Sequence, residues 1–343
     1  MRWFVTGGAG FIGANTVRRL LDDGQEVVVF DNLSRRGSEK NLDWLQERGQ
    51  GLTFVRGDVR DASAVQRAMA DHAPADVVLH FAAQVAVTTS VADPRLDFDI
   101  NALGTLNLLE AVRALRMDPV LLYTSTNKVY GDLAQHNVVA QGGRYAFELL
   151  PGGVDEAAVL DFYSPYGCSK GSADQYVRDY HRIYGLRTIV FRNSCIYGPR
   201  QFGIEDQGWL AWFVIAAVLG RPITIYGDGR QVRDVLFVDD LIEAMWTAVH
   251  RPEVTACEVY NIGGGPQHAL AVWTEFGPLL EKLLDRPIPV EHAEWRPADQ
   301  KVYISDISKA ERELGWQPKV GVREGVGRLV DWVRKNRELF GSS

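Results

Sequence analysis

The chain has 343 residues, of which 46% are hydrophobic and 24% are charged, as in an ordinary globular enzyme. Its 37 basic and 44 acidic residues give a net charge of -7, which argues against a nucleic-acid-binding protein with a basic face. The apolar runs are too short to span a membrane, no leader precedes the first expected strand, and the three cysteines suit the reducing cytoplasm.

Short apolar runs alternate with helical patterns through the first half of the chain. The runs are rich in β-branched or aromatic residues and are flanked by Gly, Asp or Asn, which is typical of buried strands. They lie at residues 2–5, 27–30, 52–55, 77–81, 120–123 and 188–191. Helical spacing between them is clearest at 16–23 and 104–115. The alternation predicts an α/β fold with a parallel sheet covered on both faces.

The pattern loosens after about residue 192, where Gly, Pro and Trp become more frequent. We predict an apolar helix at 207–219, strands at 223–226 and 259–262, and helices over 308–339 with a break at 315–318. This indicates a first domain at residues 1–192, which also receives about 230–265. A second, smaller domain at 193–343 is expected to be interleaved with it.

A glycine-rich turn follows the first strand and opens a helix. Gly7, Gly10 and Gly13 let the backbone approach a pyrophosphate at the positive end of that helix. A glycine motif alone equally fits a tight strand–helix turn. Asp31, however, lies 18 residues past Gly13 at the next strand end, near the spacing expected for a ribose 2′-hydroxyl partner. Together they predict a Rossmann-type, doubly wound parallel sheet that binds a dinucleotide.

The acid at the second strand end favours NAD, because a carboxylate would repel the 2′-phosphate of NADP. Arg35 and Arg36 nearby would suit NADP, but Asp31 occupies the strand end itself. Asp58, after the third strand, is a candidate partner of the adenine amino group, and it equally suits a helix N-cap. The other predicted cofactor-binding residues are Phe11, Ile12, Asn32, Ser34, Arg35, Val59, Phe81, Ala82, Ala83 and Asn101.

Tyr166 and Lys170 stand four residues apart, on one face of a predicted helix. A free phenol has a pKa of about 10 and is a poor base at neutral pH. A neighbouring ammonium favours the phenolate, and the same Lys can hold the nicotinamide ribose. An ordinary surface pair would explain the spacing but not the glycine motif in the same chain. We therefore predict that both residues are catalytic and also contact the cofactor.

The chain resembles the extended short-chain dehydrogenase/reductase (NAD-dependent epimerase/dehydratase) family, in the branch that acts on nucleotide sugars. The residues that carry the resemblance are Gly7, Gly10, Gly13, Asn101, Gly104, Thr105, Thr126, Tyr166, Lys170, the turn 197–200, and segments 227–234, 296–299 and 313–316. The match covers nearly the whole chain. It implies a Rossmann-type NAD-binding domain with a smaller, interleaved C-terminal substrate domain.

The resemblance also implies roles for individual residues. Thr126 aligns with the family's catalytic Ser/Thr, which bonds the reacting oxygen as it becomes a ketone. Arg233 and Arg296 align with arginines that bind the diphosphate, as guanidinium forks do well. The other predicted substrate-binding residues are Gln84, Asn193, Arg200, Gln201 and Asp299, the last for the nucleotide ribose. Cys195 departs from the family, which often has a substrate-binding Asn there.

Asn127 and Lys128 follow Thr126 and complete the predicted catalytic set. The family's 4,6-dehydratases carry Asp-Glu at these positions, and its decarboxylases usually carry Glu at the second. Asn does not titrate and Lys is cationic, so the acid–base pair that removes water is missing. What remains is oxidation and re-reduction of one carbinol, which is epimerisation.

Segment 125–132 closely resembles that of the CDP-tyvelose (CDP-paratose) 2-epimerases. The resemblance implies C2 epimerisation of a CDP-sugar, either paratose/tyvelose or glucose/mannose, through a 2-keto intermediate. It implies NAD as cofactor, no metal, and a cytoplasmic homodimer or homotetramer without nucleic-acid or membrane partners. Two alternatives remain open: a UDP-sugar 4-epimerase with the same catalytic residues, and a non-catalytic protein that binds nucleotide sugar and NAD.

Overall fold

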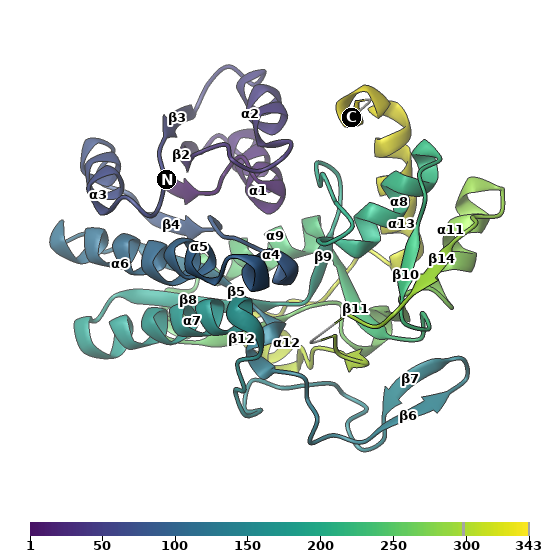
Figure 1. Ribbon diagram of the computed structural model, residues 1–343. Helices are drawn as coiled ribbons and strands as arrows, with labels where there is room; N and C mark the ends of the chain where they lie inside the picture. Colours follow the sequence, from purple (N-terminus) through teal and green to yellow (C-terminus); the bar gives the residue numbers. More distant parts are fainter. Residues whose placement is uncertain (297–298, 342–343) are drawn as a thin grey trace. The chain divides into compact units, whose positions relative to one another are not determined.

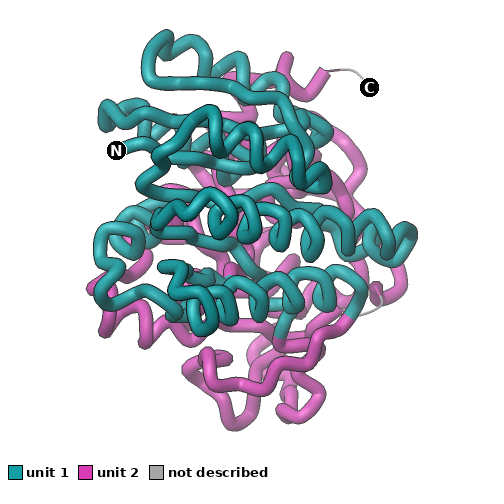
Figure 2. Tube along the Cα trace, turned by 90° about the vertical axis from the view of Figure 1, so that its left-hand side faces the viewer, with its two compact units in different colours: residues 1–129, 164–192, 242–260 teal, residues 130–163, 193–241, 261–343 magenta. Residues whose placement is uncertain are grey.

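The computed structural model describes residues 1–296 and 299–341. It consists of two compact units, each built from three stretches of chain (Figure 2). Unit 1 comprises Met1–Val129, Ser164–Arg192 and Ile242–Tyr260, and unit 2 comprises Tyr130–Tyr163, Asn193–Leu241 and the chain from Asn261 onwards.

Segment 130–163 belongs to unit 2, although the predicted boundary placed it in the first domain. The chain leaves the first unit directly after the Thr126 turn. The ring of Tyr130 stacks on Tyr303, with ring centres 6.3 Å apart, and its hydroxyl donates to Asn261 Oδ1 at 2.8 Å. These partners are far away in sequence, so the local pattern of apolar residues did not reveal the exchange.

A seven-stranded sheet has the order β12-β8-β5-β4-β1-β2-β3. Its strands are β1 (Arg2–Thr6), β2 (Glu26–Asp31), β3 (Leu52–Arg56), β4 (Val77–His80), β5 (Val120–Thr126), β8 (Arg187–Asn193) and β12 (Val259–Ile262). The pairs β3–β2, β2–β1, β1–β4 and β4–β5 are parallel. This is the doubly wound order of dinucleotide-binding folds, so the predicted Rossmann-type sheet is confirmed.

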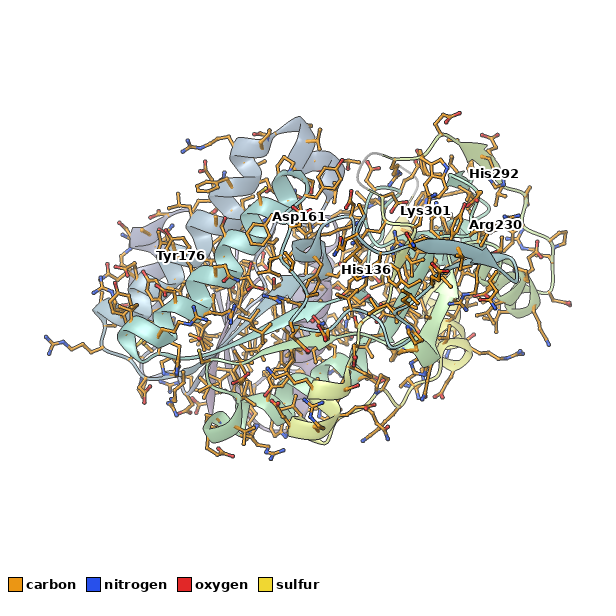
Figure 3. The ribbon with its side chains drawn as sticks, turned by 90° about the horizontal axis from the view of Figure 1, so that it is seen from below. His136, Asp161, Tyr176, Arg230, His292 and Lys301 are labelled. Carbon is orange, nitrogen blue, oxygen red and sulfur yellow. The ribbon has the colours of Figure 1, made fainter. Side chains whose placement is uncertain are left out.

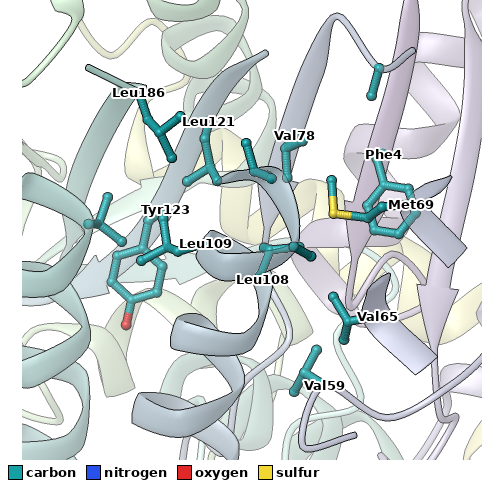
Figure 4. Packing of buried hydrophobic residues seen from close by; sticks show 14 of the residues in the cluster. Phe4, Val59, Val65, Met69, Val78, Leu108, Leu109, Leu121, Tyr123 and Leu186 are labelled. Atoms are coloured by element: carbon teal, nitrogen blue, oxygen red, sulfur yellow. The ribbon is translucent and has the colours of Figure 1, made fainter. Parts of the chain in front are cut away.

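Helices pack on both faces of this sheet (Figure 1). They are α1 (Phe11–Asp22), α2 (Ser38–Gln46), α3 (Ala62–Asp71), α4 (Val87–Ala92), α5 (Pro94–Phe98), the π-helical turn η1 (Asp99–Leu103), α6 (Gly104–Ala114), α7 (Ser164–Tyr184), α9 (Val238–Val249) and α10 (Pro252–Thr255). One core cluster joins α3, α6 and α7 to the sheet through residues such as Val65, Leu108, Val177, Val78 and Leu121 (Figure 4). Burying each such side chain contributes about 1.5–3 kcal/mol.

The described residues of unit 2 form three small sheets. The largest joins β9 (Cys195–Tyr197), β11 (Val232–Phe237), β13 (Ala269–Ala271) and β15 (Val302–Tyr303), and the others are β10 (Thr224–Tyr226) with β14 (Glu291–Ala293), and β6 (Val138–Gln141) with β7 (Arg144–Phe147). Its helices are α8 (Trp209–Leu219), α11 (Phe276–Leu284), α12 (Ser308–Leu314), α13 (Val322–Lys335) and the short turns η3 (Pro266–His268) and η4 (Arg337–Phe340). Figure 3 shows Arg230 and Lys301 beside the β6–β7 hairpin.

The predicted strands and the main helices are confirmed, with ends that differ by a few residues. Among the elements that were not predicted are the β6–β7 hairpin, the run of short helices α4, α5 and η1, the helices α2, α9 and α11, and the strands β9, β11 and β13 to β15. Among the described residues, no helix has the length and apolar character needed to cross a membrane.

Candidate active site

The turn between β1 and α1 is packed so tightly that glycine is required. Gly7 has a φ of +69°, and a Cβ there would lie 2.5 Å from the backbone nitrogen of Ala82. A Cβ on Gly13 would lie 2.2 Å from the carbonyl oxygen of Gly7. The strand–helix packing therefore explains these two glycines by itself.

Gly10 has a different environment, which suits an anionic ligand. It is the N-cap of α1, where no side chain caps the helix and the first turn holds no acidic residue. A Cβ on Gly10 would approach only the Gly7 carbonyl, at 3.2 Å, so the outer side of the turn is open. The α1 N-terminus thus offers amide groups and a positive helix end to a pyrophosphate. Phe11 and Ile12 begin the same helix.

Asp31 lies at the end of β2, buried beside the glycine turn. Its carboxylate accepts from the backbone N–H groups of Ala9 at 3.0 Å and Leu33 at 2.8 Å. Burial raises the pKa of Asp31, and these two hydrogen bonds oppose the rise. The carboxylate is thereby fixed at the place where a ribose partner is predicted.

Asp58 is held by side chains around the third strand end. Arg60 donates to both of its oxygens, at 2.9 and 2.8 Å, and Asn32 donates to one at 2.9 Å. These bonds, that of Arg60 foremost, lower the pKa of Asp58 to about 2. The N-cap of α3 is Asp61, which accepts from Ala64 N, so the helix-cap reading of Asp58 is wrong.

The remaining predicted cofactor residues line the same edge of unit 1. Phe81, Ala82 and Ala83 follow β4, and the Ala82 N–H donates to Thr6 Oγ1 at 3.3 Å. Val59 packs where a Cβ on Gly104 would fall. Ser34 and Arg35 follow Asp31 on an exposed loop. The geometry therefore suits a dinucleotide. No group of three or more metal-ligating side chains occurs within residues 1–296 and 299–341.

Thr126, Tyr166 and Lys170 meet at the end of β5, and all three are buried. Helix α7 is anchored here because the Tyr166 N–H donates to Ser90 Oγ of α4 at 3.1 Å. The Thr126 hydroxyl lies within hydrogen-bonding reach of the Tyr166 phenol. Lys170 Nζ donates to the Thr124 carbonyl at 2.6 Å and lies 4.2 Å from the centre of the Tyr123 ring. The predicted triad is thus a real spatial cluster.

Burial dominates the titration of this cluster. It raises the pKa of Tyr166 to about 12, while the bond from Thr126 and the charge of Arg35 pull the pKa down. Burial also lowers the pKa of Lys170 to about 7, opposed by the charges of Asp174 and Asp97. The phenol pKa is therefore raised rather than lowered, because loss of solvent outweighs the bond from Thr126 and the charge of Arg35.

Asn127 and Lys128 form the turn η2 (Asn127–Tyr130) directly after Thr126. The Thr126 hydroxyl donates to Asn127 Oδ1 at 3.3 Å and accepts from the Lys128 N–H at 3.3 Å. Asn127 is buried and Lys128 is half-buried. Asn127 Oδ1 and the Lys128 backbone N–H therefore orient the Thr126 hydroxyl.

Two arginines predicted to bind diphosphate lie in unit 2, each already paired with an acid. Arg233 is buried and donates to Asp299 Oδ1 at 2.7 Å and to the Gln300 carbonyl at 2.6 Å. Arg296 pairs with Asp206 at 3.0 Å, and its guanidinium lies 3.8 Å from the centre of the Tyr226 ring. A diphosphate would have to replace these carboxylates. Each arginine would then still be paired with an anion, because diphosphate and carboxylate are both negatively charged.

The other predicted substrate residues are more varied. Asn193 and Gln201 are buried, and the side-chain oxygen of each has no hydrogen-bond partner among the described residues. Arg200 has a φ of +66° and lies 6.0 Å from the centre of the Trp332 ring. Gln84 is also buried, and its amide bonds only within unit 1, to Ala86 and Asp97. These bonds account for its position without a ligand.

Three side chains near Tyr166 and Lys170 were not predicted from the sequence: Asp97, Ser169 and Asp174. Asp97 and Ser169 are hydrogen-bonded to each other, and Asp174 forms a buried ion pair with Arg192. Their only sequence signal is polarity within otherwise apolar helical positions, which is too weak to separate them from surface residues.

Comparison with known proteins places this geometry among nucleotide-sugar enzymes. A model of the GDP-mannose 4,6 dehydratase family matches residues 4–329. The CDP-paratose 2-epimerase of Salmonella typhi is 44% identical over 338 residues, which cover 97% of this chain and 99% of that protein.

Solved structures give the same result. UDP-glucose 4-epimerase from Thermotoga maritima, with UDP-glucose, matches with a TM-score of 0.85 and 33% identity, covering 98% of this chain and 100% of that chain. The dTDP-glucose 4,6-dehydratase from Streptomyces venezuelae, with NAD bound, matches with a TM-score of 0.84 and 32% identity, covering 98% of each chain.

Proposed function

Because the chain belongs to the GDP-mannose 4,6 dehydratase family of extended short-chain dehydrogenases/reductases, we propose that it is a NAD-dependent isomerase that inverts C2 of a CDP-hexose. The observation that carries the proposal is the buried Thr126–Tyr166 pair beside Lys170, with Asn127 and Lys128 after Thr126. This set can move one proton and hold one carbinol, and these two positions supply no carboxylate for removing water.

The proposed reaction has two symmetrical halves. Tyr166, as phenolate, takes the proton of the C2 hydroxyl while Thr126 holds the oxygen, and the C2 hydrogen leaves as hydride. The resulting 2-keto sugar rotates within the site and receives hydride on the opposite face of C2. Its oxygen then regains a proton from Tyr166. The glycine turn and Asp31 would hold NAD, which would supply the hydride acceptor and, once reduced, the hydride donor.

The proposed residues must also make Tyr166 a usable base. Its pKa of about 12 is too high for a base at neutral pH. Positive charge lowers it, and Arg35 already acts in that direction. The positive nicotinamide ring would add to this effect when the cofactor is bound. We propose that Lys128 contacts a sugar hydroxyl or the ketone oxygen, since its turn directly follows Thr126 and its backbone N–H bonds the Thr126 hydroxyl.

The choice of substrate rests on likeness to CDP-paratose 2-epimerase over nearly the whole chain. We propose that Arg233 and Arg296 bind the diphosphate and that Asp299 binds the nucleotide ribose once released from Arg233. The UDP-sugar 4-epimerase is the second candidate, because a solved enzyme of that kind matches the fold closely.

The test uses CDP-glucose and CDP-paratose carrying deuterium at C2, with UDP-glucose in parallel. The NAD-loaded enzyme is expected to invert C2 of at least one CDP-sugar and to retain the deuterium, because hydride leaves and returns without meeting solvent. NMR of the sugar measures both results. Inversion at C4 of UDP-glucose instead would establish the second candidate. Loss of water would mean a dehydratase, and no turnover with NAD bound would leave a binding protein.

We also propose that the chain forms a homo-oligomer through the outer side of α7. Tyr176 is 48% exposed, Ile183 65% and Tyr184 50%, so three large apolar side chains of one helix face solvent (Figure 3 labels Tyr176). Positions seven and eight residues apart share one helix face, and apolar side chains exposed together on one face mark interaction sites.

Ile183→Asp is expected to convert the oligomer to monomers, because a charge would be buried in the contact. Light scattering coupled to size-exclusion chromatography measures the mass. Val159→Asp is the matched control, since Val159 is 74% exposed in unit 2 and should leave the mass unchanged. A wild-type protein that is monomeric at micromolar concentration would contradict this proposal.

A further inference from the structure

A buried carboxylate outside the predicted site lies next to the catalytic helix. Asp97, on the five-residue helix α5, is only 1% exposed. Its Oδ1 accepts from Gln84 Nε2 at 2.8 Å and from Asn101 Nδ2 at 3.1 Å, and its Oδ2 accepts from Ser169 Oγ at 2.5 Å. All three donors are neutral.

These donors come from three different segments that converge on the site. Gln84 follows the β4 end, where Ala82 and Ala83 are predicted to contact the cofactor. Asn101 belongs to the turn before α6 and bonds the Gln84 carbonyl at 3.0 Å and Ser169 Oγ at 3.0 Å. Ser169 stands on α7 directly before Lys170. One carboxylate therefore ties the catalytic helix to the loop after β4.

The backbone is built to make this arrangement possible. Residues Asp99–Leu103 form a π-helical turn between α5 and α6. A π-turn widens the helix and redirects the side chains that follow, and such turns are frequent at functional sites. Asp97 precedes this turn and Asn101 lies within it, and the side chains of both reach Ser169.

A structural role alone does not account for a charged residue in this position. A buried carboxylate without a paired cation costs several kcal/mol relative to water, and an apolar side chain of similar size would cost less. The charge of Asp97 acts on both catalytic groups: it raises the pKa of Lys170 and that of Tyr166. Its presence therefore changes the chemistry as well as the packing.

We propose that Asp97 is a positioning residue, whose buried carboxylate fixes Ser169, and with it the neighbouring Lys170 on α7, against the β4 loop. The proposal rests on the catalytic roles of Tyr166 and Lys170 given above. It does not depend on which nucleotide sugar is the substrate or which carbon is inverted.

Other charged or titratable groups lie near Tyr166 and Lys170 and must stay unchanged in a test. They are Asp174 with its partner Arg192, the buried and neutral His80, and Arg35. His80 stays neutral because burial lowers its pKa to about 3. None of these residues is changed by a substitution at Asp97.

The decisive experiment is the pH profile of kcat for Asp97→Asn, measured on whichever nucleotide sugar the NAD-loaded wild-type enzyme turns over. We expect kcat to fall by up to about 100-fold, because small displacements of catalytic groups cost that much. We also expect both limbs of the profile to move to lower pH. Removing a negative charge makes Tyr166 easier to deprotonate and Lys170 easier to deprotonate, so both apparent values of the coupled pair decrease.

Three variants separate charge from packing. Asp97→Glu keeps the charge and should leave the limbs near their wild-type positions even if kcat falls. Asp234→Asn removes another fully buried carboxylate, in unit 2, and should not move the limbs. Ser169→Ala removes one donor and should lower kcat, which keeps the proposal testable if Asp97→Asn does not fold.

A readout without substrate comes from ultraviolet absorption of the phenolate in the NAD-loaded enzyme. The part due to Tyr166, obtained by difference with Tyr166→Phe, should titrate at lower pH in Asp97→Asn. Limbs and titration that stay in place in Asp97→Asn, or an unchanged kcat in Ser169→Ala, would overturn the proposal. Failure of C2 inversion would instead concern the substrate and would leave these measurements intact.

Discussion

Tyr166→Phe is expected to lower kcat for epimerisation by about 10²- to 10⁴-fold, the usual contribution of a positioned acid–base group. The change removes only the phenol oxygen that bonds Thr126. Because the ring remains in place in a buried site, the amount of NAD bound to the purified enzyme should stay the same. The measurement is single-turnover formation of bound NADH together with NMR of the sugar.

The same change elsewhere on the helix is the matched control. Tyr180 also lies on α7, is 6% exposed, and donates its hydroxyl to Glu110 at 2.5 Å. Tyr180→Phe should keep kcat within a few-fold of the wild type. The Tyr180 hydroxyl bonds Glu110 and could affect the site only if its loss displaced helix α7. If Tyr166→Phe retains more than about a tenth of kcat, then Tyr166 is not the base, and the proposed mechanism is wrong.

Asp174→Leu is expected to destabilise the protein by about 3–5 kcal/mol, the second large effect. Arg192 on β8 is 2% exposed and donates to both oxygens of Asp174 on α7, at 2.9 and 3.0 Å. Removing the carboxylate would leave the buried Arg192 guanidinium without the negative charge that pairs with it. The measurement is the free energy of unfolding in urea, at a fixed concentration of NAD because a bound cofactor adds stability.

The double variant Asp174→Leu with Arg192→Met should recover most of this loss, because it removes both charges and leaves apolar groups of similar size. Arg2→Met is the comparison for an exposed pair. Arg2 bonds Glu26 at 2.9 Å with both side chains accessible, so its loss should cost within about 1 kcal/mol. If Asp174→Leu lowers the free energy of unfolding by less than about 1 kcal/mol, then α7 relaxes and lets water reach Arg192.

The fold was predictable where local sequence patterns determine the secondary structure. The five parallel strands from β1 to β5 were predicted from their short apolar runs, and α1 was predicted from the glycines before it. The β6–β7 hairpin was missed because one of its strands, 138–141, is mostly exposed and lacks a clear alternation. The helices α4, α5 and η1 were missed because each is shorter than the two helical turns that a periodic pattern needs.

The sequence by itself determined which chemical groups are present: a glycine turn, an acid at the β2 end, and Tyr166 four residues before Lys170. Those features are local, since strand and helix periods place neighbours without reference to the rest of the chain. Only the tertiary structure decided what surrounds them. It placed Thr126 against Tyr166, forty residues away, and Asp97 and Arg35 within reach of the same phenol. Because burial and distant charges set a pKa, the tertiary structure alone raised that of Tyr166 and lowered that of Lys170.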